Sequence, residues 1–135
     1  MNANPISTDA ADFPIVVALP IRWGDQDAFG HVNNTVYVRC FESARIEYFA
    51  RIGLSEMMSQ ERVGPILASV TCHFRRQLNF PDTVNIGARI TGIGRTSMEM
   101  EHRIDSQATG QLVGDGESVL VVFDYEAQRP VPVPD

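Results

Sequence analysis

Residues 34–52, NTVYVRCFESARIEYFARI, form the one long segment of the chain with helical spacing. Its apolar residues recur at steps of four, three and four, which places them on one helical face. They are Tyr37, Phe41, Ala44 and Tyr48, with Cys40 beside them. Asn33 or Asn34 can cap the start, because a short side-chain oxygen accepts from the free N–H groups of a first turn, and Gly53 supplies a stop. The sequence therefore predicts a long helix that buries one stripe of side chains.

The segments around this helix predict β-strands, apart from a short second helix over residues 54–63. PIVVALPIRW, residues 14–23, is apolar and β-branched enough for a first strand. Four later runs alternate apolar and polar residues, as half-buried strands do. They lie near residues 68–75, 84–90, 98–104 and 118–125. The turns between them suggest three successive hairpins, which give an antiparallel sheet. The expected fold is α+β, with the long helix lying across a five-stranded antiparallel sheet.

Chain length and charge limit the classes of function. The 135 residues fit one domain, placed at residues 13–129 between a flexible arm over 1–12 and a tail over 130–135. A net charge of −6 argues against nucleic acid or anionic membrane as partners. No run approaches the ~20 apolar residues of a membrane span, and the N-terminal residues lack the apolar core of a secretory signal. A cytoplasmic location is expected. Cys40 and Cys72 fall in apolar patterns and are expected as small core residues.

The segment RWGDQDAFGHVNN, residues 22–34, contains two acids, a histidine and two asparagines and leads into the predicted helix. Asp25 and Asp27 match two positions of a calcium-binding loop, but Val36 stands where the bidentate glutamate is required. A transition-metal site that includes His31 lacks a second His or Cys at ligand spacing. We therefore expect neither a metal nor another cofactor. An ordinary capped turn remains an alternative, because Asp, Gly and Asn favour turns.

A catalytic interpretation follows from the position of Asp27, seven residues before Asn34. The N–H groups and dipole of a helix start stabilise negative charge. A carboxylate beside such donors provides the base and the oxyanion hole that hydrolysis of an activated acyl group needs.

The segment GDQDAFGHVNNTVYVRCFESARIEYF, residues 24–49, resembles the signature of hotdog-fold thioesterases of the 4-hydroxybenzoyl-CoA thioesterase-like family. HVNN, residues 31–34, also looks like the corresponding piece of acyl-acyl-carrier-protein thioesterases. The resemblance spans about Ile15 to Pro134. It implies a hotdog fold and hydrolysis of acyl-CoA thioesters to a carboxylic acid and CoA.

The resemblance also implies roles for individual residues. Asp27 matches the family's catalytic Asp, acting as general base or as nucleophile, and the main-chain N–H of Asn34 matches its oxyanion donor. Some members carry His where this chain has Asn34, so a second ionisable group is lost there. His31 either orients Asp27, water or substrate, or simply closes the loop. Glu42 and Glu47 are fallback catalysts, and each is alternatively an ion-pair partner, Glu42 with Arg45.

A CoA substrate would need local positive charge for its phosphates. The candidates are Arg75, Arg76 and the turn GRTS, with Arg95, Thr96 and Ser97. Tyr37 is expected to line the acyl pocket. The family pairs its sheets side by side, so we expect a homodimer or a homotetramer with the tunnel at the subunit interface. The alternatives are a non-catalytic acyl-CoA or acyl-carrier binding protein, and a hotdog hydratase or dehydratase, which would need a catalytic His.

Overall fold

The structure is a computed structural model and describes residues 13–133. The predicted arm over residues 1–12 lies outside this range, as do the last two residues of the predicted tail. The elements along the chain are β1 (Ile15–Pro20), the 3-10 turn η2 (Trp23–Asp25), α1 (Asn34–Arg51), α2 (Leu54–Glu61), β2 (Val63–Phe74), β3 (Thr83–Ile93), β4 (Ser97–Ser106), β5 (Leu112–Asp124) and β6 (Arg129–Pro130). No helix within the described residues is long and apolar enough to cross a membrane.

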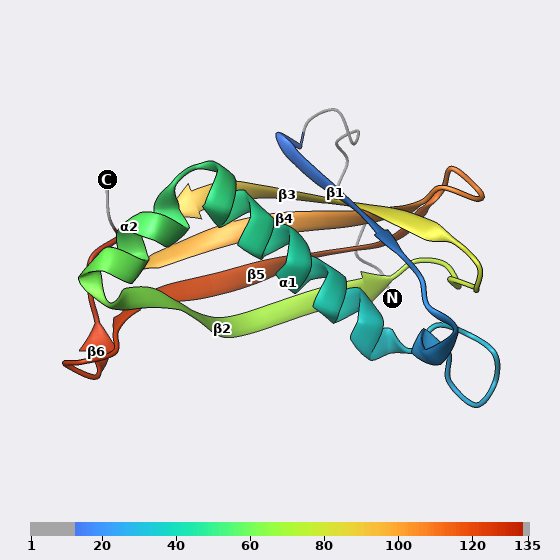
Figure 1. The fold of residues 1–135 in the computed structure, drawn as a ribbon, viewed down its shortest axis with the longest axis horizontal. Coiled ribbons are helices and arrows are strands. Elements are labelled where there is room, and N and C mark those ends of the chain that lie inside the picture. The colour runs from blue at the N-terminus through green and yellow to red at the C-terminus, as the bar shows by residue number, and fades with distance from the viewer. Residues whose placement is uncertain (1–12, 134–135) are drawn as a thin grey trace.

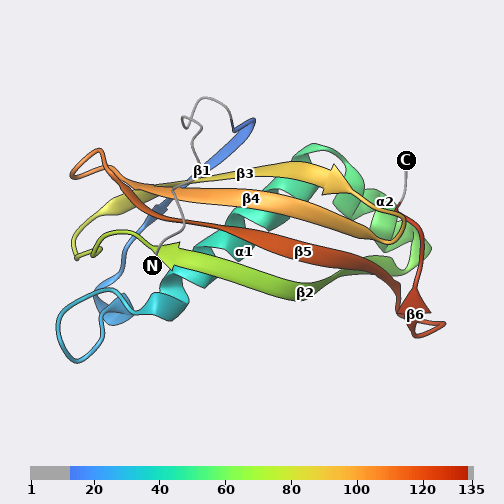
Figure 2. The same cartoon turned by 180° about the vertical axis from the view of Figure 1, so that it is seen from behind.

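The strands form one curved antiparallel sheet, and α1 lies across one of its faces (Figures 1 and 2). The strand order is β1-β3-β4-β5-β2, and β6 pairs with β5 as a sixth, two-residue strand. This arrangement confirms the predicted α+β hotdog fold, with one strand more than expected.

The prediction of three successive hairpins is wrong at the first of them. β3–β4 and β4–β5 are hairpins, but β2 pairs with β5 and leaves β3 to pair with β1. β2 also begins at Val63, earlier than predicted, and an irregularity between Leu67 and Ser69 interrupts its alternation. A bulge shifts side chains to the other face, so the period-2 pattern is visible only beyond it.

β5 begins at Leu112, earlier than the strand predicted near residues 118–125, so Gly114 and Gly116 lie inside it. A Cβ on Gly116 would lie 1.9 Å from the carbonyl oxygen of Thr71, and one on Gly114 would lie 3.0 Å from the Tyr37 ring. These glycines therefore permit the close approach of β2 and α1 to β5.

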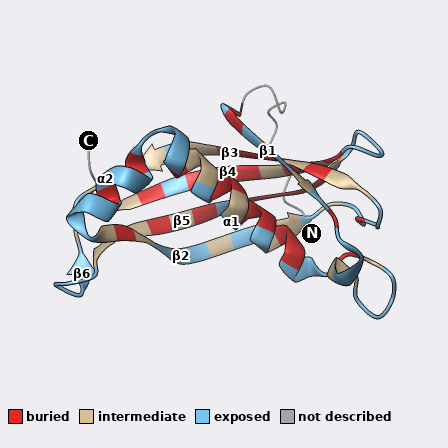
Figure 3. Ribbon diagram, viewed as in Figure 1, coloured by how far each residue is buried: buried red, intermediate tan, exposed pale blue. Residues whose placement is uncertain are grey.

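Three buried side chains of α1 contact β5, and the buried positions of the helix are red in Figure 3. Tyr37 lies against Gly114, Phe41 lies against Gly116, and the buried Arg45 donates from Nη1 to the Ser118 hydroxyl at 3.2 Å. Of the predicted stripe, Tyr37, Cys40, Phe41 and Ala44 are buried, whereas Tyr48 is half-buried. The sequence pattern contained no indication that a charged residue, Arg45, would join this face.

Arg45 belongs to a buried polar row that continues into β4. The Ser118 hydroxyl lies 2.9 Å from Nε2 of His102, and the His102 ring stacks on Phe41 at 4.7 Å. Burial, assisted by the charge of Arg45, lowers the pKa of His102 to about 3. His102 is therefore a neutral structural residue, fully enclosed in the core.

Candidate active site

The loop between η2 and α1 is held closed by Asp27. The Asp27 N–H donates to the His31 carbonyl at 2.7 Å. Carboxylate oxygen Oδ1 of Asp27 accepts from the N–H groups of Phe29 at 2.8 Å and His31 at 3.2 Å. Gly30 takes the positive φ of +82° that the turn requires. Within residues 13–133, no donor reaches the other oxygen, Oδ2.

The start of α1 is capped by Asn33, which resolves the choice between the two asparagines. Its side-chain oxygen accepts from both the N–H and the hydroxyl of Thr35, each at 2.9 Å. Asn34 is the first helical residue, and its main-chain N–H has no acceptor in the described part of the chain. An N–H left free at a helix start is available to an anionic ligand.

Asp25 fixes the turn before the loop. Its Oδ2 accepts from the N–H of Arg22 at 2.8 Å, and its carbonyl accepts from the N–H of Asn33 at 2.9 Å. Asp25 therefore connects η2 to the cap of α1, a contact that sequence spacing alone did not suggest.

A cleft of about 300 Å³ opens between this loop, the first turn of α1 and the segment that follows β2. We call it the loop cleft. It brings together six of the nine predicted site residues: Asp27, His31, Asn34, Tyr37, Arg75 and Arg76. Val32, Phe74, Gln77 and Leu78 complete its lining.

The predicted cationic residues of the loop cleft differ in their partners. Arg75 forms an ion pair with the buried Asp115, with Nη2 and Oδ1 separated by 3.0 Å. Arg76 donates from Nε to Gln111 at 3.0 Å, and no carboxylate of the described residues pairs with it. Arg76 is therefore the cation of this cleft whose charge is not neutralised by an ion pair.

Tyr37 forms a fixed wall of the loop cleft. Its hydroxyl donates to the carbonyl of Arg76 at 2.9 Å, and its ring meets Phe74 edge-on at 5.0 Å. Burial raises the pKa of Tyr37 to about 12, so the phenol stays neutral. The tie to Arg76 also holds the segment after β2 against α1.

The turn from β3 to β4, which contains Arg95, Thr96 and Ser97, lies at the end of the sheet opposite the start of α1 (Figure 1). The carbonyl of Thr96 accepts from Val122, which is opposite Pro65 near the start of β2, whereas the loop cleft lies beyond Phe74 at its end. Nine residues of strand separate Pro65 from Phe74, or about 30 Å at the rise of a β-strand. A single chain therefore does not bring the GRTS turn to the loop cleft.

Neither of the two helical carboxylates, Glu42 and Glu47, lines the loop cleft. Glu47 pairs with Arg51 at 2.6 Å. The predicted Glu42–Arg45 ion pair is absent from the described residues, because Arg45 turns inward to Ser118. Within residues 13–133, no three His, Cys, Asp or Glu side chains gather as a metal site requires.

Gln77 and Leu78 are among the lining residues that were not predicted from the sequence. The carbonyl of Leu78 accepts from the N–H of Val32 at 2.9 Å and so pins the loop to the segment after β2. This pairing of main-chain groups far apart in the sequence leaves no local pattern.

Comparisons with known proteins agree with the fold. The family model of the thioesterase-like superfamily matches residues 21–135. A thioesterase from Thermus thermophilus, solved in complex with coenzyme A and Zn, is 34% identical with a TM-score of 0.77, over 91% of this chain and 88% of that one. The long-chain acyl-CoA thioesterase FadM of Escherichia coli K12 is 22% identical over 82% of this chain and 84% of its own length.

A more distant structure, the DHNA-CoA thioesterase from Staphylococcus aureus, shares the fold with a TM-score of 0.79 at 18% identity, over 87% of this chain and 79% of that one. The match to the family model covers most of the chain and includes the loop, both helices and strands β2 to β6. The chain therefore belongs to the thioesterase-like superfamily and is a thioester hydrolase of the hotdog fold.

Proposed function

We propose that the protein hydrolyses acyl-CoA thioesters to a carboxylic acid and CoA in the loop cleft. The observation that carries this proposal is that a carboxylate with one uncommitted oxygen, on Asp27, and a free helix-start N–H, on Asn34, line the same cleft. The CoA bound to the Thermus relative and the acyl-CoA substrate class of FadM support CoA as the carrier.

The two carboxylate oxygens of Asp27 have different roles, one structural and one chemical. Oδ1 is held by two N–H groups of the loop, so the carboxylate keeps its orientation, and Oδ2 is left available for the reaction. As a general base, Oδ2 takes a proton from water while that water attacks the thioester carbonyl carbon, and the C–S bond then breaks to release CoA as thiolate. As a nucleophile, Oδ2 attacks that carbon itself, CoA leaves as thiolate, and water hydrolyses the resulting anhydride.

The main-chain N–H of Asn34 stabilises the developing oxyanion in either route. A free donor at the positive end of α1 binds the carbonyl oxygen more strongly as it gains charge. The side chain of His31 lines the same cleft and orients water or substrate, while its main chain closes the loop. Tyr37 bounds the acyl group. Arg76 supplies positive charge near the CoA phosphates, because Arg75 is already paired with Asp115.

A homodimer completes this site. β2 is an edge strand with exposed apolar side chains, including Ile66, Leu67 and Phe74, and an unpaired edge of this kind favours pairing with another strand. Antiparallel pairing of two β2 edges reverses the direction of the second sheet. The partner's GRTS turn would then lie at the same end as the loop cleft, where Arg95, Thr96 and Ser97 can bind phosphate. Two such dimers could form the tetramer.

The two alternative functions, a hydratase and a non-catalytic binding protein, differ from a hydrolase in which residues they require. A hydratase needs a catalytic His, and among the described residues only His31 lines the loop cleft, since His102 is enclosed in the core. A binding protein would not need an intact Asp27. No feature of the cleft favours either function over hydrolysis.

The test is hydrolysis of short, long and aromatic acyl-CoAs, and of acyl-carrier-protein thioesters, by the wild type and by Asp27→Asn. Asn can still accept the loop hydrogen bonds at Oδ1, so the variant should fold while kcat falls at least about 100-fold. A wild type that binds these thioesters without hydrolysing them would favour the binding protein. Full activity in Asp27→Asn would exclude Asp27 as the catalyst.

A further inference from the structure

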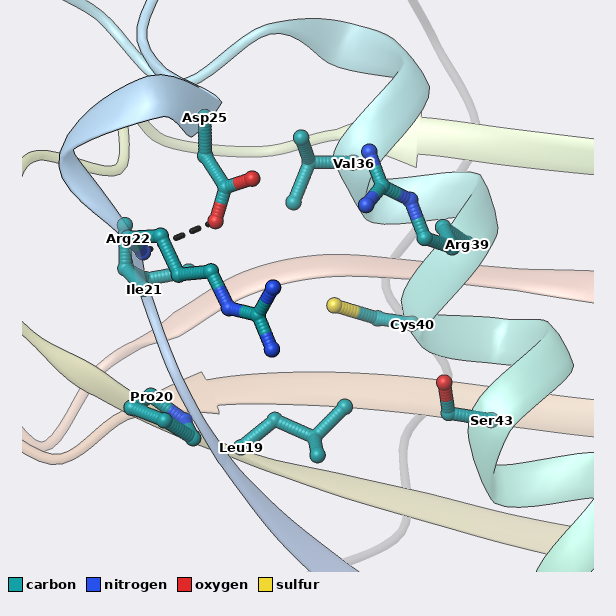
Figure 4. Close-up of a pocket in the computed structure, with 9 residues that line it drawn as sticks. All are labelled: Leu19, Pro20, Ile21, Arg22, Asp25, Val36, Arg39, Cys40 and Ser43. Carbon is teal, nitrogen blue, oxygen red and sulfur yellow. Dashed lines mark hydrogen bonds between the residues drawn. The ribbon is translucent and has the colours of Figure 1, made fainter.

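A second cleft, of about 190 Å³, lies between β1 and the first turns of α1 (Figure 4). We call it the β1 cleft. Its lining is Leu19, Pro20, Ile21, Arg22, Asp25, Val36, Arg39, Cys40 and Ser43. None of these residues lines the loop cleft, so the β1 cleft is a separate site.

Positive charge dominates the polar part of the β1 cleft. Arg22 approaches from the segment after β1, and Arg39 lies on the α1 side of the same space (Figure 4). In the described part of the chain, neither guanidinium forms an ion pair. Asp25 is the one carboxylate in the lining, and its Oδ2 already accepts from the main chain of Arg22. Two cations against one anion leave this cleft positive on a chain of net charge −6.

The remaining walls are apolar. Ile21 and Val36 are buried core residues, and Leu19 packs against the same core. The thiol of Cys40 points into the space beside Arg22 (Figure 4). Burial raises the pKa of this thiol to about 11, so at neutral pH it adds no negative charge that would compete with an anionic ligand.

The size of the β1 cleft restricts the ligand. Its 190 Å³ corresponds to about six water molecules at roughly 30 Å³ each. Pockets for drug-sized ligands begin near ~300 Å³. A small molecule fits within this volume, whereas a nucleotide or the pantetheine arm of CoA would extend beyond it.

We propose that the β1 cleft binds a small carboxylic acid, with its carboxylate between Arg22 and Arg39 and its apolar body on Leu19, Ile21 and Val36. A planar guanidinium matches a carboxylate with paired hydrogen bonds, and the Ser43 hydroxyl offers one further donor. Short aliphatic acids and aromatic acids share this chemistry. Binding here requires no hydrolytic step, so the proposal stands apart from the function assigned to the loop cleft.

The test is a titration of the ¹⁵N-labelled protein with hexanoate and with benzoate, in which the amide chemical shifts report binding. At least one acid should give saturating shifts at Ile21, Asp25, Arg39 and Cys40. Arg22→Gln and Arg39→Gln should each weaken that binding by about tenfold or more, because each removes a charge-assisted hydrogen bond. Both side chains are exposed, so the variants should keep the dispersed spectrum of the folded protein.

Three controls separate the β1 cleft from general effects. Arg51→Gln removes a positive charge from the same helix outside the cleft and should bind like the wild type. Arg76→Gln alters only the loop cleft and should also leave the affinity unchanged. Hexan-1-ol lacks the charge and inorganic phosphate lacks the apolar body, so both should bind more weakly than the acid.

Several results would overturn the proposal. Shifts confined to Asp27, Asn34 and Arg76 would place the acid in the loop cleft. Wild-type affinity in both Arg22→Gln and Arg39→Gln would show that neither arginine binds the acid. Equal binding of hexan-1-ol or of phosphate would contradict the combined recognition of charge and apolar surface.

Discussion

Asp27 and His31 hold each other through two hydrogen bonds, from the Asp27 N–H to the His31 carbonyl at 2.7 Å and from the His31 N–H to Asp27 Oδ1 at 3.2 Å. One oxygen of the proposed catalytic carboxylate therefore maintains the loop that carries it. The other oxygen remains for chemistry, and its direction is set by the first. The structural and catalytic explanations of the loop, which compete at the level of sequence, are compatible in this geometry.

The free energy of unfolding should distinguish the helix cap at Asn33 from the proposed oxyanion donor at Asn34. Asn33→Ala loses the bonds to the N–H and hydroxyl of Thr35, so the free energy of unfolding should fall by about 1 kcal/mol. Asn34→Ala should change it by less than about 0.5 kcal/mol. Urea denaturation of the two variants measures this difference, and equal losses would contradict the assignment of Asn33 as the cap.

Features with a local cause could be predicted from the sequence. The helix was expected over residues 34–52 and is observed as Asn34–Arg51, because its apolar spacing and its stop at Gly53 are properties of neighbouring residues. The loop residues Asp27, His31 and Asn34 were placed together for the same reason, since they are close in sequence and stand next to the helix start.

Features that depend on distant contacts could not be predicted. Pairing of β2 with β5 rather than β3 depends on the whole sheet. The burial of Arg45 depends on Ser118, a partner 73 residues away. The GRTS turn shows a further limit, because its proposed role requires a second chain that no periodicity within one chain describes.

If two β2 edges pair in the proposed dimer, a charge added to β2 should change the oligomeric state, whereas a charge added to β1 should not. Leu67 on β2 and Val16 on β1 are both 40% exposed. Leu67→Lys should block edge pairing, because a charged side chain resists strand addition, and should give a monomer with reduced thioesterase activity. Val16→Lys, at the opposite edge, should keep the wild-type mass.

Size-exclusion chromatography with light scattering measures the mass of each variant, and circular dichroism checks that both are folded. A wild type that is monomeric and fully active would contradict the need for a partner. So would an unchanged mass for Leu67→Lys.

His102 should make the folded protein sensitive to acid. Its pKa is about 3 in the fold, against 6.5 for an ordinary histidine. Above pH 6.5 it is neutral in both states and its contribution to stability is fully present. As the pH falls from 6.5 towards 3, the unfolded chain binds a proton that the folded protein does not. The free energy of unfolding then falls by up to about 1.4 kcal/mol per pH unit.

His102→Phe and His102→Gln remove this titration, the first keeping the contact with Phe41 and the second keeping a polar partner for Ser118. The stability difference between the wild type and either variant should shift by up to about 2 kcal/mol between pH 6.5 and pH 5. Urea denaturation at both pH values measures this shift, and a difference that stays constant would show that His102 is not held neutral.

In the proposed mechanism, the main-chain N–H of Asn34 stabilises the oxyanion formed opposite Asp27. Proline at Asn34 removes that N–H and suits the first position of a helix. The preceding Asn33, at φ −63° and ψ 140°, already has the extended conformation that proline favours in the residue before it. Asn34→Pro should therefore fold with near wild-type stability.

The most direct measurement is kcat for acyl-CoA hydrolysis by Asn34→Pro and Asn34→Ala, each confirmed as folded. Asn34→Ala keeps the N–H and should retain most of the wild-type rate, whereas Asn34→Pro should lose about 100- to 1,000-fold in kcat. Equal rates for a folded Asn34→Pro and the wild type, or an equal loss in Asn34→Ala and Asn34→Pro, would contradict the account.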